Sequence, residues 1–207
     1  MLFRSIDILG ELPGLLPSTA WKRQRRDQPW FPGETIITGI GQGFFLTTPV
    51  QLATAVAALA NGGRILQPNI VMAEQEAGSD ELLPHHPRLL ETITINDQAH
   101  WDAVINAMVD VVHSARGTAR KIGVDSPYKI AGKTGTAQVY GLKQEEKYDA
   151  EAIEEKLRDH ALFIAFAPAE QPKIAVAVIV ENGGGGGSVA APIARAILDA
   201  YLQDKAP

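Results

Sequence analysis

The sequence predicts an α/β protein of the α+β type, in which a mostly antiparallel sheet is covered by helices. The first observation is a pair of short apolar runs rich in β-branched residues, Ala161–Ala167 and Ile174–Val180, joined by Pro168–Lys173. Runs of this length and composition are typical of neighbouring buried strands in a hairpin. The second observation is that helical patterns come before and after these strands, which favours a sheet with segregated helices. We expect a helical part over about 1–125 and a sheet part over about 126–207.

The first 47 residues are rich in proline, glycine and aromatic residues and show little periodicity, so they predict no regular element. The basic run Lys22–Arg26 is interpreted as a solvated loop or helix face. Residues 64–96 are expected to be irregular or to form short strands, because 78–81 and 84–87 carry loop signals.

A helix is predicted over Val50–Ala60. Thr48-Pro49 provides a hydroxyl N-cap and a proline at the first helical position, and Asn61-Gly62-Gly63 ends the helix. The segment is nearly all apolar and rich in alanine, so we expect it to be buried.

The next predicted helix begins at Asn96 or Asp97, either of which can cap it. Its apolar residues recur at helical spacing and would form one face. These residues are Trp101, Val104, Ile105, Met108, Val111 and Val112. Residues 125–127 then break the chain before a further strand.

Residues 141–160 are strongly charged, and Tyr148–Arg158 is predicted to form a short helix. The acidic segment Glu145–Glu155 is interpreted as a solvated helix face, with a partner contact as the alternative. Five glycines, Gly183–Gly187, are interpreted as a flexible turn. An anion cradle at the next helix is the alternative, but no lysine or Walker pattern accompanies them.

The last predicted helix runs from about Ala190 to Gln203. Four apolar side chains are expected to give it a core-facing side. They are Ile193, Ile197, Leu198 and Tyr201.

The composition of the chain argues against several classes of function. The chain has 207 residues and a net charge of −5, and this negative charge does not favour nucleic-acid binding. It has no cysteine, which excludes disulfides and thiolate catalysis. No apolar run approaches the roughly 20 residues that cross a bilayer, and no signal peptide opens the sequence. The histidines show no metal-ligand spacing, and His160 is expected to be structural. We expect no metal and no cofactor.

The segment Tyr128–Val139 carries the most informative residues, Lys133-Thr134-Gly135-Thr136. On a strand, Thr134 and Thr136 share one face, while Lys133 and Gly135 share the other. Two hydroxyls beside an ammonium can hold a carboxylate, and a glycine lets a ligand approach the backbone. Backbone N–H groups on an exposed strand edge could pair with a peptide or donate to an oxyanion.

This tetrapeptide resembles the Lys-Thr-Gly element of the penicillin-binding proteins and serine β-lactamases. The resemblance continues, in the order of class B penicillin-binding proteins, over most of the chain after about residue 6. The matching segments are Trp21-Lys22, Gln28–Trp30, Gly33–Thr35, Gly39–Gly43, Thr48–Leu52, Asn61–Gly63, Gly132–Val139, Leu157–His160, Ala165–Pro168 and Val180–Gly184.

The resemblance implies a penicillin-binding transpeptidase or serine β-lactamase-like fold, incomplete at its N-terminal side. It implies a peptidoglycan D,D-transpeptidase that cross-links stem peptides during cell elongation and is acylated by β-lactams. The implied location is the periplasmic face of the inner membrane, with an N-terminal anchor absent from this sequence. The implied partner is a rod-complex glycosyltransferase of that membrane.

The resemblance also implies roles for individual residues. Lys133 would support the proton network and the electrostatics of the active site. Thr134 and Thr136 would bind the substrate or β-lactam carboxylate beside Gly135, and the Thr136 backbone N–H would supply half of the oxyanion hole.

The family also needs a Ser-x-x-Lys element, which carries the nucleophile, and a Ser-x-Asn or Ser-x-Asp element. We expect both to lie upstream and to be absent from this chain, which we interpret as the C-terminal portion of the domain. One literal Ser-x-x-Lys occurs, Ser126-Pro127-Tyr128-Lys129. We reject Ser126 as the nucleophile, because Pro127 biases it away from the helical conformation that would bring serine and lysine together.

Two alternatives remain beside this interpretation, and a nucleotide-binding loop is rejected. A chain without a nucleophile fits a non-catalytic binding remnant. A serine β-lactamase is disfavoured by the context of Gly39–Gly43. The same glycines superficially resemble a nucleotide loop but lack the full G-x-G-x-x-G spacing.

Overall fold

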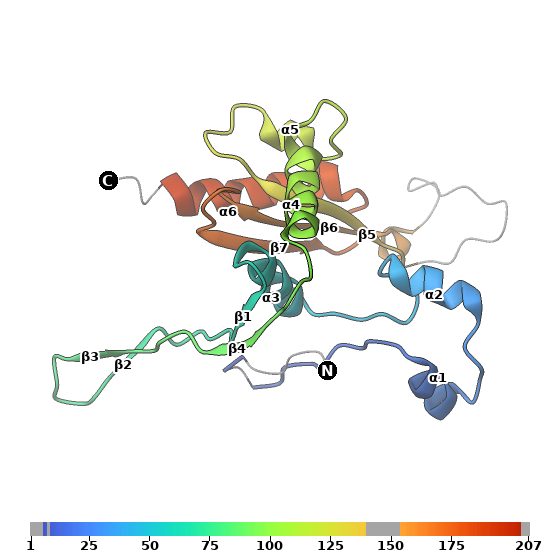
Figure 1. Ribbon diagram of the computed structural model, residues 1–207, viewed down its shortest axis with the longest axis horizontal. Coiled ribbons are helices and arrows are strands. Elements are labelled where there is room, and N and C mark those ends of the chain that lie inside the picture. Colours follow the sequence, from blue (N-terminus) through green and yellow to red (C-terminus); the bar gives the residue numbers. More distant parts are fainter. Residues whose placement is uncertain (1–5, 8, 140–153, 204–207) are drawn as a thin grey trace. The chain divides into compact units, whose positions relative to one another are not determined.

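The computed structural model describes residues 6–7, 9–139 and 154–203 (Figure 1). In chain order, the helices and strands are α1 (Thr19–Arg26), α2 (Pro32–Gly39), α3 (Pro49–Ala60), β1 (Arg64–Leu66), β2 (Ala73–Gln75), β3 (Leu82–Pro84), β4 (Leu89–Thr92), α4 (Gln98–His113), α5 (Arg120–Gly123), β5 (Ala131–Ala137), the 3₁₀ turn η1 (Glu155–Leu157), β6 (His160–Ala167), β7 (Ile174–Val180), the π-helical turn η2 (Gly186–Ala190) and α6 (Ala191–Gln203).

The chain divides into two compact units. Unit 1 comprises residues 1–51 and 66–91, and unit 2 comprises residues 52–65 and 92–207. Unit 1 holds α1, α2 and the antiparallel pair β2–β3. Unit 2 holds the larger helices and the three-stranded sheet.

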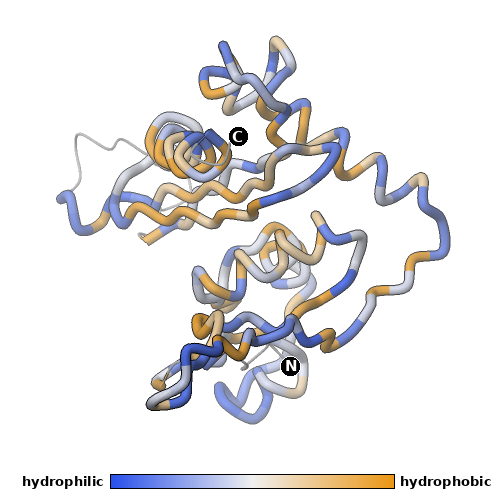
Figure 2. The backbone as a smooth tube through the Cα atoms, turned by 90° about the vertical axis from the view of Figure 1, so that its left-hand side faces the viewer, coloured by the Kyte–Doolittle hydropathy of each residue, from blue (hydrophilic) through white to orange (hydrophobic). Residues whose placement is uncertain are grey.

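The sheet of unit 2 is antiparallel and has the order β5–β6–β7. Lys133 lies opposite Ile164 and Thr134 opposite Phe163, while Phe163 in turn lies opposite Val178. Strands β6 and β7 are rich in apolar residues, and orange stretches run through the sheet in Figure 2. The sequence prediction of a hairpin over 161–167 and 174–180 is confirmed.

Helix α6 packs on one face of this sheet and α3 on the other. Phe163 and Leu198 are fully buried in one hydrophobic cluster between the sheet and α6. Phe166 and Met108 belong to a second cluster, which α3 joins through Val56. Helix α4, which lies in front of the strands in Figure 1, contributes Val112 to the first cluster and Met108 to the second. Alternate residues of β6 therefore enter opposite cores, which confirms an antiparallel sheet covered by helices.

The predicted helices over 50–60 and from residue 98 are confirmed as α3 and α4. Asp97 caps α4, because its side chain accepts a hydrogen bond from the Ala99 N–H. Met108 and Val112 are buried on the predicted face of α4, but Val104 is exposed.

The C-terminal helix is confirmed, but most of its predicted core face is wrong. Ile193, Ile197 and Tyr201 are exposed, and Leu198 is buried as predicted. The other residues buried from α6 are small, Ala191 and Ala194. Small side chains let a helix approach a sheet closely, so hydrophobicity alone misplaces the contact face.

Helices α1 and α2 were not predicted. Each has a local start signal: Ser18 accepts a hydrogen bond from the Trp21 N–H, and Glu34 accepts one from the Phe31 N–H. Glu34 also binds the ammonium of Lys22 at 2.6 Å. The solvated interpretation of the basic run is therefore wrong for Lys22, whose side chain is buried, although Arg23, Arg25 and Arg26 are exposed.

The predicted helix over Tyr148–Arg158 and the acidic segment Glu145–Glu155 lie mostly outside the described residues. Their described end forms the turn η1. In the part of the chain that the structure describes, no helix combines the length and the apolar character needed to cross a bilayer.

Candidate active site

The predicted site residues lie on β5, an outer strand of the three-stranded sheet. The register with β6 places Thr134 and Thr136 opposite Phe163 and Ala161, both of which belong to the cluster under α6. Lys133 lies opposite Ile164, which packs in the other cluster. The two hydroxyl residues therefore share one face and Lys133 the other, as the alternation of a strand requires.

The polar groups on β5 remain accessible. Lys133 and Thr136 are exposed, and Thr134 is half-buried. The Lys133 ammonium donates to the carbonyl oxygen of Thr134 at 2.7 Å. The Thr134 hydroxyl lies 3.0 Å from the hydroxyl of Thr118, which comes from the loop between α4 and α5. Sequence reasoning missed Thr118, because no local pattern links residues that lie on different elements.

The glycine run packs directly on this strand. A Cβ atom at Gly186 would lie 2.3 Å from the Leu162 carbonyl oxygen and 2.5 Å from the Gly135 carbonyl oxygen. A Cβ atom at Gly187 would lie 2.3 Å from the Thr118 carbonyl oxygen. Such distances exclude a side chain, so close packing explains these two glycines. The interpretation of the run as a flexible turn is wrong for Gly186 and Gly187, because both belong to the π-helical turn η2, which packs against β5 and the Thr118 loop.

The start of β5 is tied to α4 through His113. The Ile130 N–H donates to His113 Nε2 at 2.9 Å, so that nitrogen acts as an acceptor and the ring is neutral. Burial lowers the pKa of His113, and the nearby charges of Lys129 and Arg195 lower it further. A neutral ring therefore holds the backbone just before the site residues.

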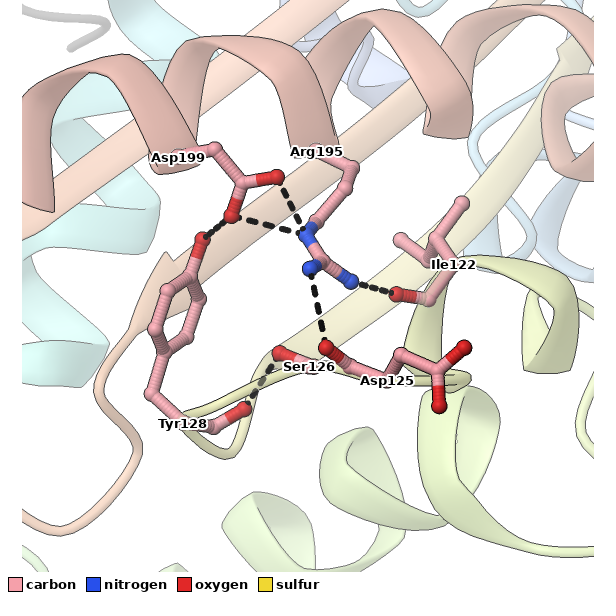
Figure 3. Close-up of polar contacts among 6 residues, drawn as sticks. All are labelled: Ile122, Asp125, Ser126, Tyr128, Arg195 and Asp199. Atoms are coloured by element: carbon pink, nitrogen blue, oxygen red, sulfur yellow. Dashed lines mark hydrogen bonds and ion pairs between the residues drawn. The ribbon is translucent and has the colours of Figure 1, made fainter. Parts of the chain in front are cut away.

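A second polar cluster ties the same segment to α6, as Figure 3 shows. Tyr128 donates from its hydroxyl to Asp199, and Arg195 binds the same carboxylate at 2.8 Å. The Arg195 guanidinium also donates to the Ile122 carbonyl oxygen at 2.6 Å. Burial, together with the hydrogen bond to Asp199, raises the pKa of Tyr128, so its hydroxyl stays a donor.

The carboxylate of Asp199 stays ionised in this cluster. Burial opposes that state, but the hydrogen bonds from Tyr128 and Arg195 lower its pKa. The cluster thus joins α5, the segment before β5 and α6 through groups with fixed donor and acceptor roles.

Comparison with known proteins identifies the family. The penicillin binding protein transpeptidase domain matches residues 5–199. The chain belongs to this family. It is 43% identical to the peptidoglycan D,D-transpeptidase MrdA of Haemophilus influenzae over 203 residues, which cover 98% of this chain and 31% of that protein.

Solved structures agree with this assignment. The structure of Pseudomonas aeruginosa PBP2 in complex with WCK 5153 superposes with a TM-score of 0.79 at 48% identity, over 97% of this chain and 41% of that one. The complex between PBP2 and MreC from Helicobacter pylori gives 0.75 at 29% identity, over 96% and 33% of the two chains. The chain thus spans about a third of the length of the curated relatives it matches.

The one Ser-x-x-Lys of this transpeptidase-family chain does not have the geometry of an activated nucleophile. The Ser126 hydroxyl donates to the Tyr128 carbonyl oxygen at 2.6 Å, also drawn in Figure 3. The Lys129 ammonium instead binds Glu170 at 3.0 Å. Neither side chain is arranged to take a proton from the other, which supports the rejection of Ser126.

The expectation that the sequence contains no Ser-x-Asp is wrong, since Ser5-Ile6-Asp7 fits the pattern. Ser5 lies outside the described residues. The Asp7 carboxylate accepts hydrogen bonds from the N–H groups of Ile70 and Val71 in unit 1. Those bonds, from Val71 and then Ile70, lower the pKa of Asp7. Asp7 therefore serves the local structure of unit 1.

Among the described residues, no three histidine, aspartate or glutamate side chains are grouped to hold a metal ion. His160 opens β6, and its Nδ1 accepts from the Asn182 N–H at 2.9 Å, which fits a structural role.

Proposed function

We propose that this chain supplies the Lys-Thr-Gly side of a serine-type peptidoglycan D,D-transpeptidase and forms the C-terminal portion of its catalytic domain. The observation that carries the proposal is the position of Lys133-Thr134-Gly135-Thr136 on an outer strand in a chain of the transpeptidase family. An outer strand offers backbone groups and side chains to an extended peptide.

The reaction assigns a role to each residue. A serine attacks the penultimate D-Ala carbonyl of a stem peptide, the terminal D-Ala leaves, and the acyl group passes to an amine of a neighbouring peptide. Thr134 and Thr136 bind the terminal carboxylate, and Gly135 leaves room for the ligand against the strand. The Thr136 N–H donates to the developing oxyanion, and Lys133 provides positive charge and a route for protons.

We propose that the nucleophile is contributed by residues that precede this sequence. The geometry of Ser126 and Lys129 supports that proposal, as does the fact that the chain spans only about a third of its curated relatives. We also propose that the whole protein works on the periplasmic side of the inner membrane, because peptidoglycan is cross-linked there.

A partner can also be proposed from the solved structures. One structurally similar protein belongs to a peptidoglycan synthase complex in which polymerization and crosslinking are coordinated. We propose that the whole protein works beside a glycosyltransferase of this kind, since newly polymerised glycan is the substrate for cross-linking.

Acylation of the full-length protein tests the function. After incubation with a penicillin, intact mass is expected to show one adduct per protein, and peptide mapping is expected to place it on a serine outside this sequence. Ser126→Ala is expected to keep the adduct. A protein without any adduct, or one that loses the adduct in Ser126→Ala, would contradict the proposal.

A lysine pair provides a matched control for the site. Lys133→Ala is expected to slow acylation about a hundredfold, the usual contribution of a residue that handles protons or developing charge. Lys129→Ala removes an exposed lysine from the same segment and is expected to change the rate less than about twofold. Equal changes in the acylation rate for the two substitutions would show that Lys133 has no special role in the site.

The alternatives differ in whether an acyl group forms and in its fate. A non-catalytic binding remnant would bind the penicillin without a covalent adduct. A serine β-lactamase would release hydrolysed penicillin with rapid turnover, whereas a transpeptidase retains the acyl group.

A further inference from the structure

The hydroxyl pair formed by Thr118 and Thr134 is a polar contact at the proposed site that the roles above do not use. The two oxygen atoms lie 3.0 Å apart, and either can be the donor. Thr118 is exposed and Thr134 is half-buried, so a ligand at the edge of β5 can reach this pair.

The loop that carries Thr118 is fixed on both sides of that residue. A Cβ atom at Gly117 would lie 2.4 Å from the Val111 carbonyl oxygen, so the loop passes tightly over the end of α4. The Ala119 N–H donates to the same carbonyl at 3.0 Å, and the Ala119 side chain is buried. The position of Thr118 is therefore set by its neighbours.

Thr134 is fixed through both branches of its side chain. Its methyl group lies 3.4 Å from the position that a Cβ atom on Gly187 would occupy, and its hydroxyl faces Thr118. A threonine has few rotamers, so these two contacts select one of them. The Gly187 turn also touches the Thr118 carbonyl oxygen, which joins the three residues in one packed group.

The number of protons on the two hydroxyls decides which threonine donates to the other when a carboxylate is bound. A hydroxyl has one proton to donate and two lone pairs that accept, whereas a carboxylate only accepts. When Thr134 donates to a carboxylate, the bond between the two threonines must be made by the proton of Thr118. Thr118 then polarises the Thr134 hydroxyl and strengthens its bond to the anion.

We propose that Thr118 is a positioning residue that makes the site selective for carboxylate-bearing acyl donors by orienting the Thr134 hydroxyl toward the ligand. The inference rests on the proposed function, because it takes the carboxylate of the acyl donor as the ligand of Thr134. It adds a residue from a separate loop to a site otherwise built on β5.

Two ligands that differ only at the carboxylate test this inference in the full-length protein. Acylation rates are measured with a penicillin and with its methyl ester, which lacks the negative charge. In Thr118→Val, the rate ratio of acid to ester is expected to fall about tenfold, the usual scale of a hydrogen bond that supports a charged acceptor. Thr118→Ser retains the hydroxyl and is expected to keep the ratio within about twofold of the wild type.

A double-substitution cycle adds a second readout. Thr134→Val is expected to lower the same ratio, and Thr118→Val in that background is expected to lower it no further, because Thr118 acts through Thr134. Thermal unfolding confirms that each variant folds, and Thr118→Ala replaces Thr118→Val if the latter does not.

Three outcomes would overturn the inference. An unchanged ratio of acid to ester in Thr118→Val, with or without equal slowing of both ligands, would remove Thr118 from carboxylate recognition. Independent losses in the double variant would show that Thr118 does not act through Thr134. Both of these outcomes leave the proposed function intact. A wild-type protein that neither penicillin nor ester acylates would overturn the proposed function, and this inference with it.

Discussion

The two units of this chain are stabilised in different ways. Apart from Pro17, all the buried aliphatic and aromatic side chains in the described residues lie in unit 2, and the other buried residues of unit 1 are Lys22 and Gln51. Unit 2 therefore has a hydrophobic core of its own, and that core supports the strand with the site residues. Unit 1 depends on a few specific contacts.

The contacts of unit 1 can be named individually. Lys22 binds both oxygens of Glu34, and its ammonium lies 4.3 Å from the ring centre of Phe31. The Gln51 side chain donates to the Pro13 carbonyl oxygen at 3.1 Å. A buried lysine needs its anion, so such contacts define a local geometry without the large free energy that apolar burial supplies.

The largest expected difference between the units comes from truncating one apolar side chain in each. Phe163→Ala removes a fully buried ring from the core of unit 2 and is expected to cost about 3–5 kcal/mol of unfolding free energy. Ile36→Ala truncates a side chain in unit 1 that is 71% exposed, and is expected to cost less than about 0.5 kcal/mol. Denaturant titration of the full-length protein measures both, and similar losses would contradict the contrast.

A glycine pair gives the next largest effect. Gly186→Ala forces a methyl group against the Leu162 and Gly135 carbonyl oxygens and is expected to cost about 1–3 kcal/mol, with slower acylation by a penicillin. Gly39→Ala, at the end of α2 in unit 1, meets no atom within 4 Å and serves as the control. Normal acylation by a well-folded Gly186→Ala protein would separate the turn from the site.

Removal of one hydroxyl from the cluster in Figure 3 is expected to have a smaller effect. Tyr128→Phe loses the hydrogen bond to Asp199 but keeps the ring, and Arg195 still neutralises the carboxylate. We expect a loss of about 1 kcal/mol in thermal or denaturant unfolding. A loss several times larger would mean that the hydroxyl, rather than the ion pair, maintains this junction.

The smallest expected effect is a pH dependence of the stability of unit 2. The folded state lowers the pKa of His113 below its usual 6.5, so the unfolded chain takes up a proton first as the pH falls. The contribution of His113 to the unfolding free energy is therefore complete above pH 6.5 and is lost as the pH falls below that value. His113→Gln keeps a hydrogen-bond acceptor for Ile130 without a titrating ring, and is expected to flatten unfolding free energy against pH in that window. An unchanged slope of unfolding free energy against pH in His113→Gln would show that another group causes the pH dependence.

The sequence predicted the elements whose signals are local. Strands β6 and β7 are continuous apolar runs, α4 begins at a capping aspartate, and the faces of Thr134 and Thr136 follow from the alternation of any strand. These features depend on neighbours in the chain, so a pattern can reveal them.

Features that depend on tertiary contacts could not be predicted. Lys22 is buried because Glu34 reaches it from another helix, and Thr118 meets Thr134 because a loop and a strand converge. The buried face of α6 is set by two alanines that allow close approach, whereas the larger isoleucines nearby are exposed. Residue type alone does not indicate which of two apolar faces packs.

The most direct test of the central claim is a structure of the full-length protein acylated by a penicillin. The expected result is an adduct on a serine that precedes this sequence, with its carbonyl oxygen in hydrogen-bond range of the Thr136 N–H and its carboxylate on the hydroxyls of Thr134 and Thr136. An adduct on Ser126, or a carboxylate bound away from β5, would contradict the assignment of this strand as one side of a transpeptidase active site.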